Sequence, residues 1–258
     1  MVLRYSFFRW DGFTTPKYIG LSNYINLFKS DVFLLSVKNT FIYSAVTVSL
    51  TIIIGFMLAL VIERRIKGWS FFRAAWFLPV IISQTIIGAL WSKIYEPSSG
   101  LLNTLLRGMG LGFLAQQWLG NPKLALYAVS AVNVLHSSGF AMLLLLVAME
   151  GIPKEIHEAA NIDGITPFKR VTHIIFPLIK HTFLIVLMLQ IIGALKTFDT
   201  IMVLTGGGPG NTTTVFSMLI YRSSFEQYLW GYGSAVSVIM FLLLFFISYA
   251  YQKIILKL

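Results

Sequence analysis

The sequence predicts an all-α fold, a polytopic bundle of helices that crosses a membrane five times. Of its 258 residues, 57% are hydrophobic and only 12% are charged, whereas a soluble domain carries about 25% charged residues. The few charges are unevenly spread, so that long stretches contain none. These stretches are unbroken apolar runs and not short alternating segments, which excludes a membrane β-barrel.

Residues 1–38 predict an irregular segment outside the membrane. Aromatic residues are interleaved there with turn formers such as Asp11-Gly12, Pro16 and Gly20, a pattern typical of surface loops. The apolar sequence at Met1 is interrupted by Arg4 and is too short for a signal peptide. We therefore divide the chain into an extracytoplasmic segment, 1–38, and a membrane domain, 39–258.

Five apolar runs predict the membrane-spanning helices. Four of them contain no Asp, Glu, Lys or Arg and are long enough to cross or nearly cross a hydrocarbon layer of about 30 Å. They cover residues 39–62, 74–92, 124–149 and 227–252. The fifth, 182–195, is shorter and continues beyond Lys196 and Asp199 as residues 200–204. Pro79 inside the second run predicts a kink in that helix.

The basic residues favour one orientation only in part. The two membrane sides would carry ten bases each, so the positive-inside preference gives a tie. Without residues 1–38 the count becomes ten to five, with the loops 63–73 and 150–181 in the cytoplasm. A net charge of +10 could also indicate nucleic-acid binding. In an apolar chain, however, such bases anchor helices at the lipid surface, and we expect no nucleic acid partner.

Two near-motifs for catalysis fail at a required position. His157-Glu158 starts an HExxH zinc pattern, but Asn161 replaces the second histidine. Gly206 to Thr212 resembles a phosphate-binding loop, yet Asn211 stands where the lysine is required. The chain has no cysteine, which excludes thiolate metal sites and cysteine nucleophiles. We expect no catalytic residue and no metal site.

The loop 150–181 predicts two helices joined by a glycine turn. Pro153 suits a helix N-terminus, and Ile156, Ala159 and Ala160 follow at i, i+3 and i+4 as a small apolar face. Asp163-Gly164 ends this helix, because glycine adopts the left-handed conformation of a helix stop. Thr166-Pro167 starts a second helix, and Pro177 bends it into the next span. Small exposed alanines at a membrane surface favour docking into a groove of another protein.

This loop closely resembles the EAA loop of permease subunits in binding-protein-dependent ABC importers. The residues that carry the resemblance are Glu158-Ala159-Ala160-Asn161-Ile162-Asp163-Gly164, followed by Phe168, Ile174, Ile175 and Pro177. Ser99 to Asn103, Lys196 to Asp199 and Leu204 to Gly210 look like the carbohydrate-uptake branch, the maltose and multiple-sugar type. The resemblance extends over nearly the whole chain.

The resemblance implies the partners and the mechanism. In such importers the EAA loop inserts its short helix into a cleft of a separate ATPase pair, which binds ATP and magnesium. A second permease subunit and an extracytoplasmic solute-binding protein complete the transporter in the inner membrane of a bacterium or archaeon. Residues 39–258 would form the permease domain and would bind no cofactor. The coupling residues implied here are Glu158, Ala159, Ala160, Asp163, Gly164 and Pro177.

Polar residues within the apolar runs are candidates for the solute path, because a lone polar group facing lipid is costly. The candidates are Gln84, Asn133, His136, Ser137 and Gln190. Hydrogen bonds between helices would explain each of them equally well. If they contact the solute, a sugar is a suitable ligand for such hydrogen-bonding groups.

Two other function classes stay open from the residues alone. An ion-coupled secondary transporter or channel uses an intramembrane carboxylate or charge relay, and only Lys196 and Asp199 near a span end could supply one. An intramembrane metalloprotease would depend on the incomplete HExxH pattern. Co-purification of an ATPase separates a permease from both alternatives.

The resembling permeases have a six-helix core, so one helix is missing from the five spans. Residues Met1 to Trp10 look like the end of that first helix entering an outer loop. We therefore expect Met1 to be an internal methionine, with a further apolar stretch of about 20 residues encoded upstream. An in-frame stop codon directly before Met1 would contradict this expectation.

Overall fold

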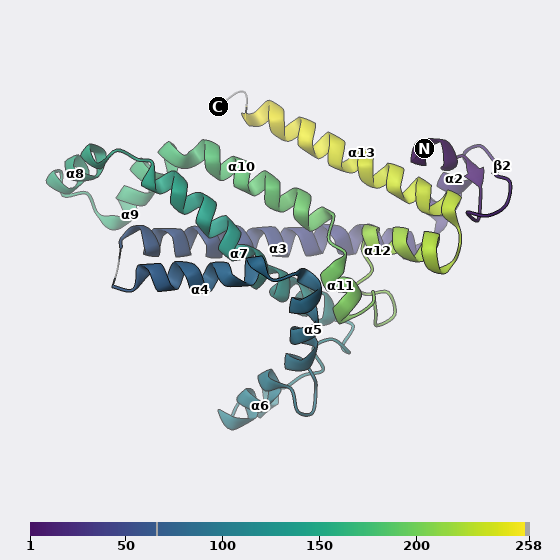
Figure 1. Cartoon of the computed structure of the whole chain (residues 1–258), viewed down its shortest axis with the longest axis horizontal. Coiled ribbons are helices and arrows are strands. Elements are labelled where there is room, and N and C mark those ends of the chain that lie inside the picture. Colours follow the sequence, from purple (N-terminus) through teal and green to yellow (C-terminus); the bar gives the residue numbers. More distant parts are fainter. Residues whose placement is uncertain (66, 256–258) are drawn as a thin grey trace.

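The computed structural model describes residues 1–65 and 67–255 and consists mainly of helices (Figure 1). Four helical segments are long and apolar enough to cross a membrane: α3 (Asp31–Glu63), α7 (Ala125–Glu150), the segment Pro167–Leu195, and α13 (Trp230–Ile255). A broken helix pair forms a fifth candidate span. The structure confirms the predicted all-helical membrane bundle.

Helices α3 and α7 form the centre of the bundle. They approach closely at Gly55, where an added Cβ would lie 2.8 Å from Cβ of Ala141 and 3.0 Å from the backbone nitrogen of Met142. Buried apolar side chains from both helices belong to one core, including Val48, Ile52, Met142 and Leu145. Without a hydrophobic force between helices inside lipid, such close packing of small residues holds them together.

Helix α3 begins eight residues earlier than the charge-free run. Ser30 caps it, because its hydroxyl accepts a hydrogen bond from the backbone N–H of Phe33 at 3.4 Å. Asp31 in the first turn suits the positive end of the helix dipole. A helix of 33 residues is about 50 Å long, so its charged end extends beyond the hydrocarbon layer.

The second span is broken, a sharper change of direction than the predicted kink, and the break follows Pro79 by three residues. Helix α4 (Trp69–Ile81) contains Pro79, and α5 (Gln84–Ile94) continues at an angle of 101° after Ile82 and Ser83. Pro79 has no N–H to support the last turn of α4. Ser83 then starts a new helix, since its hydroxyl accepts from the N–H of Ile86 at 3.3 Å.

The span predicted at residues 182–195 begins further towards the N-terminus than expected. Helix α10 (Phe176–Leu195) continues from α9 (Pro167–Lys169) and the π-helical segment η2 (Arg170–Ile175) as one span of 29 residues. Residues 200–204 do not extend it, because α11 (Asp199–Leu204) is a separate helix. Pro177 does not bend the span sharply. The π turn, with Phe176 N–H donating to Val171, precedes the proline and accommodates its missing donor.

The first thirty residues form a small ordered unit at the N-terminal end of α13. Short helices α1 (Val2–Tyr5) and α2 (Ser22–Lys29) flank the hairpin of β1 (Phe8–Arg9) and β2 (Lys17–Tyr18), in which Phe8 pairs with Tyr18. The side-chain amide of Asn23 donates to Ser6 and Phe8 carbonyls at 2.8 and 3.0 Å. This segment is more regular than the sequence predicts, because those bonds join residues 15 to 17 positions apart.

Two loops complete the chain between its spans. The first contains α6 (Leu101–Gly108) and η1 (Gly112–Leu114) and reaches away from the bundle with α5 (Figure 1). The second contains α11, the glycine-rich turn, α12 (Phe216–Tyr221) and the π segment η3 (Arg222–Glu226). Arg222 donates to the side chain of Asn211 at 2.7 Å and to the carbonyl of Gly206. Arg222 therefore fixes the glycine-rich turn through hydrogen bonds from outside the turn.

Asn103 organises the first loop, so we expect Asn103→Asp to loosen it. Its buried amide donates to the carbonyls of Pro97 and Gln116 at 3.1 and 2.9 Å, and its oxygen accepts from the indole of Trp118 at 2.8 Å. A carboxylate of the same shape would face both carbonyls without a donor, which costs about 1–3 kcal/mol. Limited proteolysis between residues 109 and 117 should become faster, while Asn121→Asp, at an exposed turn, serves as control. Unchanged cleavage would contradict this role.

Candidate functional site

The loop 150–181 contains the short helix that its spacing predicts. Helix α8 (Lys154–Ile162) follows Pro153, ends at Asp163, and buries only Ala160 among its residues. Glu158 and Ala159 are exposed. Figure 1 places α8 at one end of the molecule, opposite the N-terminal unit. The helix therefore lies at the end of the bundle, with Glu155 and Glu158 accessible.

The turn after α8 depends on glycine. Gly164 has φ +63°, a conformation that side chains other than glycine rarely adopt. Its N–H donates to Asn161 at 3.2 Å, and Ile165 N–H donates to Ala160 at 3.2 Å, which closes the helix end. Thr166 then caps the next helix, as predicted, through its hydroxyl and the N–H of Lys169 at 3.5 Å.

Two large apolar side chains lie exposed beside this turn. Ile162 is 86% exposed and Phe168 is 77% exposed. Sequence reasoning did not select Ile162 as a site residue, although it is a large apolar residue at the very end of a short surface helix. Exposed apolar residues next to charged ones are typical of a protein contact surface. We refer to Glu158, Ala159, Ile162 and Phe168 as the docking surface.

A second site, between α5, α7 and α10, brings four predicted path residues together. Gln84 of α5, His136 and Ser137 of α7, and Gln190 of α10 line one cavity of about 230 Å³. Val80, Phe140 and Leu189 complete its wall. None of these seven residues carries a carboxylate or a lysine or arginine charge, so the cavity offers amides, a hydroxyl and an imidazole. Such a lining suits a neutral, hydroxyl-bearing solute.

Asn133, the fifth path candidate, does not line this cavity. It is buried, and its side-chain oxygen accepts a hydrogen bond from the hydroxyl of Ser137 at 3.1 Å. Asn133 thus lies behind Ser137 and orients its hydroxyl.

His136 connects the cavity with the broken span. One ring nitrogen, Nε2, lies 3.2 Å from the carbonyl of Ile82, at the break between α4 and α5. A carbonyl only accepts, so Nε2 carries the proton. A neighbouring apolar cavity of about 370 Å³ is lined by Trp76, Pro79, Trp91 and His136, among others. His136 therefore donates a hydrogen bond to a carbonyl at the break and borders both cavities.

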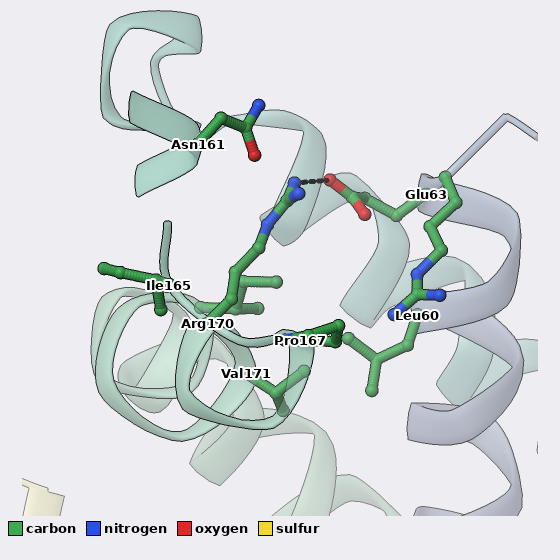
Figure 2. Close-up of a pocket in the computed structure, with 9 residues that line it drawn as sticks. Leu60, Glu63, Asn161, Ile165, Pro167, Arg170 and Val171 are labelled. Carbon is green, nitrogen blue, oxygen red and sulfur yellow. Dashed lines mark hydrogen bonds and ion pairs between the residues drawn. The ribbon is translucent and has the colours of Figure 1, made fainter. Parts of the chain in front are cut away.

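The residues described by the structure hold no group of three or more His, Asp or Glu side chains placed for a metal ion. His157, the first residue of the incomplete HExxH pattern, is instead bound to Arg170, with Nδ1 2.9 Å from NH2. Arg170 also pairs with Glu63 at 3.3 Å (Figure 2).

Comparisons with known proteins match this chain to one family. Residues 51–257 match the family described as "Binding-protein-dependent transport system inner membrane component". The chain is 36% identical over 237 residues to the trehalose/maltose transport system permease protein MalF of Thermococcus litoralis, covering 92% of this chain and 79% of that protein. It is also 32% identical to the diacetylchitobiose uptake system permease protein NgcF of Streptomyces coelicolor, covering 90% and 69% respectively.

Solved structures show the same architecture. A chain of a bacterial alginate ABC transporter, crystallised with an alginate pentasaccharide-bound periplasmic protein, superposes with a TM-score of 0.82 at 26% identity. The match covers 92% of this chain and 84% of that chain. The arrangement of helices around the bundle is therefore shared with a transporter of solved structure.

Proposed function

The chain belongs to the binding-protein-dependent transport system inner membrane components and is a transmembrane permease subunit of an ABC importer; from this we infer that it carries a sugar or a related small polar solute. The observation that supports the solute class is the cavity of Gln84, His136, Ser137 and Gln190. Neutral donors and acceptors at this site match sugar hydroxyls. Trehalose, maltose and diacetylchitobiose, named for two relatives, are the first solutes to test.

The chain itself is not an enzyme, and ATPase activity belongs to a separate subunit of such importers. We propose that the docking surface contacts an ATPase pair that binds ATP and magnesium. Glu158 would accept charge-assisted hydrogen bonds from it, and Ala159 and Ala160 would allow a close approach. The coupling residues Asp163, Gly164 and Pro177 would set the position of α8 relative to the span that follows.

The remaining partners are proposed on the same basis. A second, different permease subunit would complete the path across the cytoplasmic membrane of a bacterium or archaeon. An extracytoplasmic solute-binding protein would deliver the sugar at the end where the N-terminal unit lies. The apolar spans of this multi-pass chain contact membrane lipid. The first test is purification of the tagged chain from its native membrane, which should retain an ATPase subunit. Absence of an ATPase subunit from the purified sample would contradict the proposed importer function.

Gln190→Leu is expected to lower sugar uptake about tenfold, because losing one hydrogen bond of the path leaves solute hydroxyls unsatisfied. The measurement uses the assembled transporter in liposomes with radiolabelled trehalose, maltose and diacetylchitobiose, and methionine as a solute of another class. Gln84→Leu should act in the same direction. Gln252→Leu, at the exposed end of α13, is the matched control.

The amount of ATPase that co-purifies with Gln190→Leu should equal that of the unaltered chain. Normal uptake by both cavity variants would remove these residues from the solute path. Uptake of methionine without uptake of any sugar would overturn the proposed solute class.

A further inference from the structure

One arginine joins three separate elements at the end of the bundle where α8 lies. Arg170 is the first residue of η2, and its NH2 nitrogen lies 3.3 Å from Oε1 of Glu63, the last residue of α3. The same nitrogen lies 2.9 Å from Nδ1 of His157 on α8. Figure 2 shows the Arg170 side chain extended towards Glu63. These contacts link residues 107 and 13 positions apart in the chain.

The hydrogen-bonding roles in this cluster follow from chemistry. A guanidinium group only donates, so Nδ1 of His157 is the acceptor and its ring is neutral, with the proton on Nε2. Glu63 provides the single negative charge of the three residues. Their side chains are 14% exposed for Glu63 and 28% for Arg170, so water screens this pair less than a surface pair. Loss of either charge would leave the other one poorly compensated.

Helix α8 has a small apolar contact with the bundle. Ala160 is its only buried residue, and Ile156 packs against the core while partly exposed. A cavity of about 200 Å³ lies between the end of α3 and the turn after α8, lined by Leu60 on one side and by Asn161, Ile165 and Pro167 on the other. The Arg170 contacts lie at this cavity, which Arg170 and Glu63 also line. The polar cluster therefore adds a direct contact between α8 and the Arg170–Glu63 pair at this cavity.

The local backbone points to the same residue. Arg170 begins the π-helical segment, a form that is uncommon in proteins and frequent at functional sites. Its Nε is buried and has no hydrogen-bond partner among the described residues. The guanidinium thus keeps donor capacity that a second arrangement of its surroundings could use. A residue with these properties is suited to link moving parts.

We propose that Arg170 is a positioning residue that joins α8 to the end of α3, so that a displacement of α8 is transmitted to the membrane bundle. The proposal rests on the proposed function, in which α8 contacts the ATPase. Arg170 contacts neither solute nor nucleotide in this role. Glu63 and His157 are its two anchors, one on each side.

Distances between spin labels test the connection between α8 and α3 directly. The chain contains no cysteine, so an engineered pair of cysteines is the only place in it where labels attach. Labels at Glu155→Cys on α8 and Val61→Cys on α3 should give one narrow distance distribution in the transporter purified with its partners. Arg170→Met is expected to broaden that distribution about twofold, since α8 then moves independently. A sample without engineered cysteines supplies the background of the partner subunits. Lys169→Met, the exposed neighbouring base, is the matched control and should change nothing.

A second label pair, Met57→Cys on α3 and Leu178→Cys on α10, reports whether the bundle is intact. If Arg170→Met also changes the Met57–Leu178 distance distribution, Glu63→Gln is used in its place. Glu63→Gln should broaden the α8–α3 distribution and leave the Met57–Leu178 distribution unchanged. The reversed pair Glu63→Arg with Arg170→Glu should restore the narrow distribution, because the carboxylate introduced by Arg170→Glu can accept from the other tautomer of His157. A purely space-filling role would not be rescued by this exchange.

Function is measured on the same samples. Arg170→Met should retain the ATPase subunit and its ATP hydrolysis while uptake of the transported sugar falls about tenfold. A narrow α8–α3 distribution in both single variants, or full uptake, overturns the proposal. Absence of an ATPase from the unaltered preparation would instead contradict the proposed function, whereas the distances concern this chain alone.

Discussion

Gly164→Val is expected to lower solute uptake about tenfold or more while the chain still reaches the membrane. Gly164 adopts φ +63°, and a side chain in the left-handed region costs about 1–2 kcal/mol, more when it is β-branched. A Cβ at this position would have no neighbour within 4 Å. The effect therefore comes from the backbone, which would leave the turn and move α8 and its docking surface.

The matched control for this prediction is Gly164→Asn. Asparagine tolerates the left-handed conformation better than other side chains, so uptake should stay close to normal. The measurement is uptake in whole cells, normalised to the amount of chain in the membrane. Equal uptake by the valine and asparagine variants would mean that the glycine turn does not set the position of α8 for transport.

Gly139→Ala is expected to destabilise the bundle by roughly 3 kcal/mol, because the added methyl group would meet the backbone of a neighbouring helix. An added Cβ would overlap the carbonyl oxygen of Trp76 and would lie 2.9 Å from its carbonyl carbon and 3.1 Å from Cα of Phe77. Those atoms belong to the backbone of α4, which cannot relieve the clash by a rotamer change as a side chain could. Helices α4 and α7 would have to separate near the cavity that Val80 of α4 and Ser137 of α7 both line.

Gly193→Ala on α10 is the control for this prediction. A Cβ there meets nothing within 4 Å, so the variant should be as stable as the unaltered chain or slightly more stable, because alanine favours helix. The midpoint of thermal unfolding in detergent, followed by size-exclusion chromatography, compares the variants. Equal midpoints for Gly139→Ala and Gly193→Ala would contradict the prediction, because they would show that α4 shifts to accommodate the methyl group without loss of stability.

Local sequence patterns predict several parts of the site correctly. The turn at Gly164 and the cap at Thr166 depend on residues within a few positions of each other, and the structure contains both. The same locality explains α8, whose limits follow from Pro153 and Asp163. Patterns of this kind require no knowledge of distant contacts.

Other features depend on contacts that no local pattern contains. The break between α4 and α5 involves His136, 54 residues away from the carbonyl of Ile82 that it contacts. The pair of Glu63 and Arg170 is separated by 107 residues. Asn133 and Ser137 share a helix face, yet only Ser137 lines the cavity, and Asn133 is buried. Periodicity predicts which residues share a face and not which neighbour that face will meet.

By itself the sequence determined the membrane character of the chain, its helical class and the short helix and glycine turn within residues 150–181. Composition and short motifs are sufficient there, because apolar runs must satisfy their backbone as helices inside lipid. Only the tertiary structure decided where the second span breaks and which polar residues converge on one cavity. It also decided that one arginine joins α8 to α3. These outcomes depend on how the helices pack. Packing brings together residues that are far apart in the sequence, and no local sequence pattern indicates which of them will be in contact.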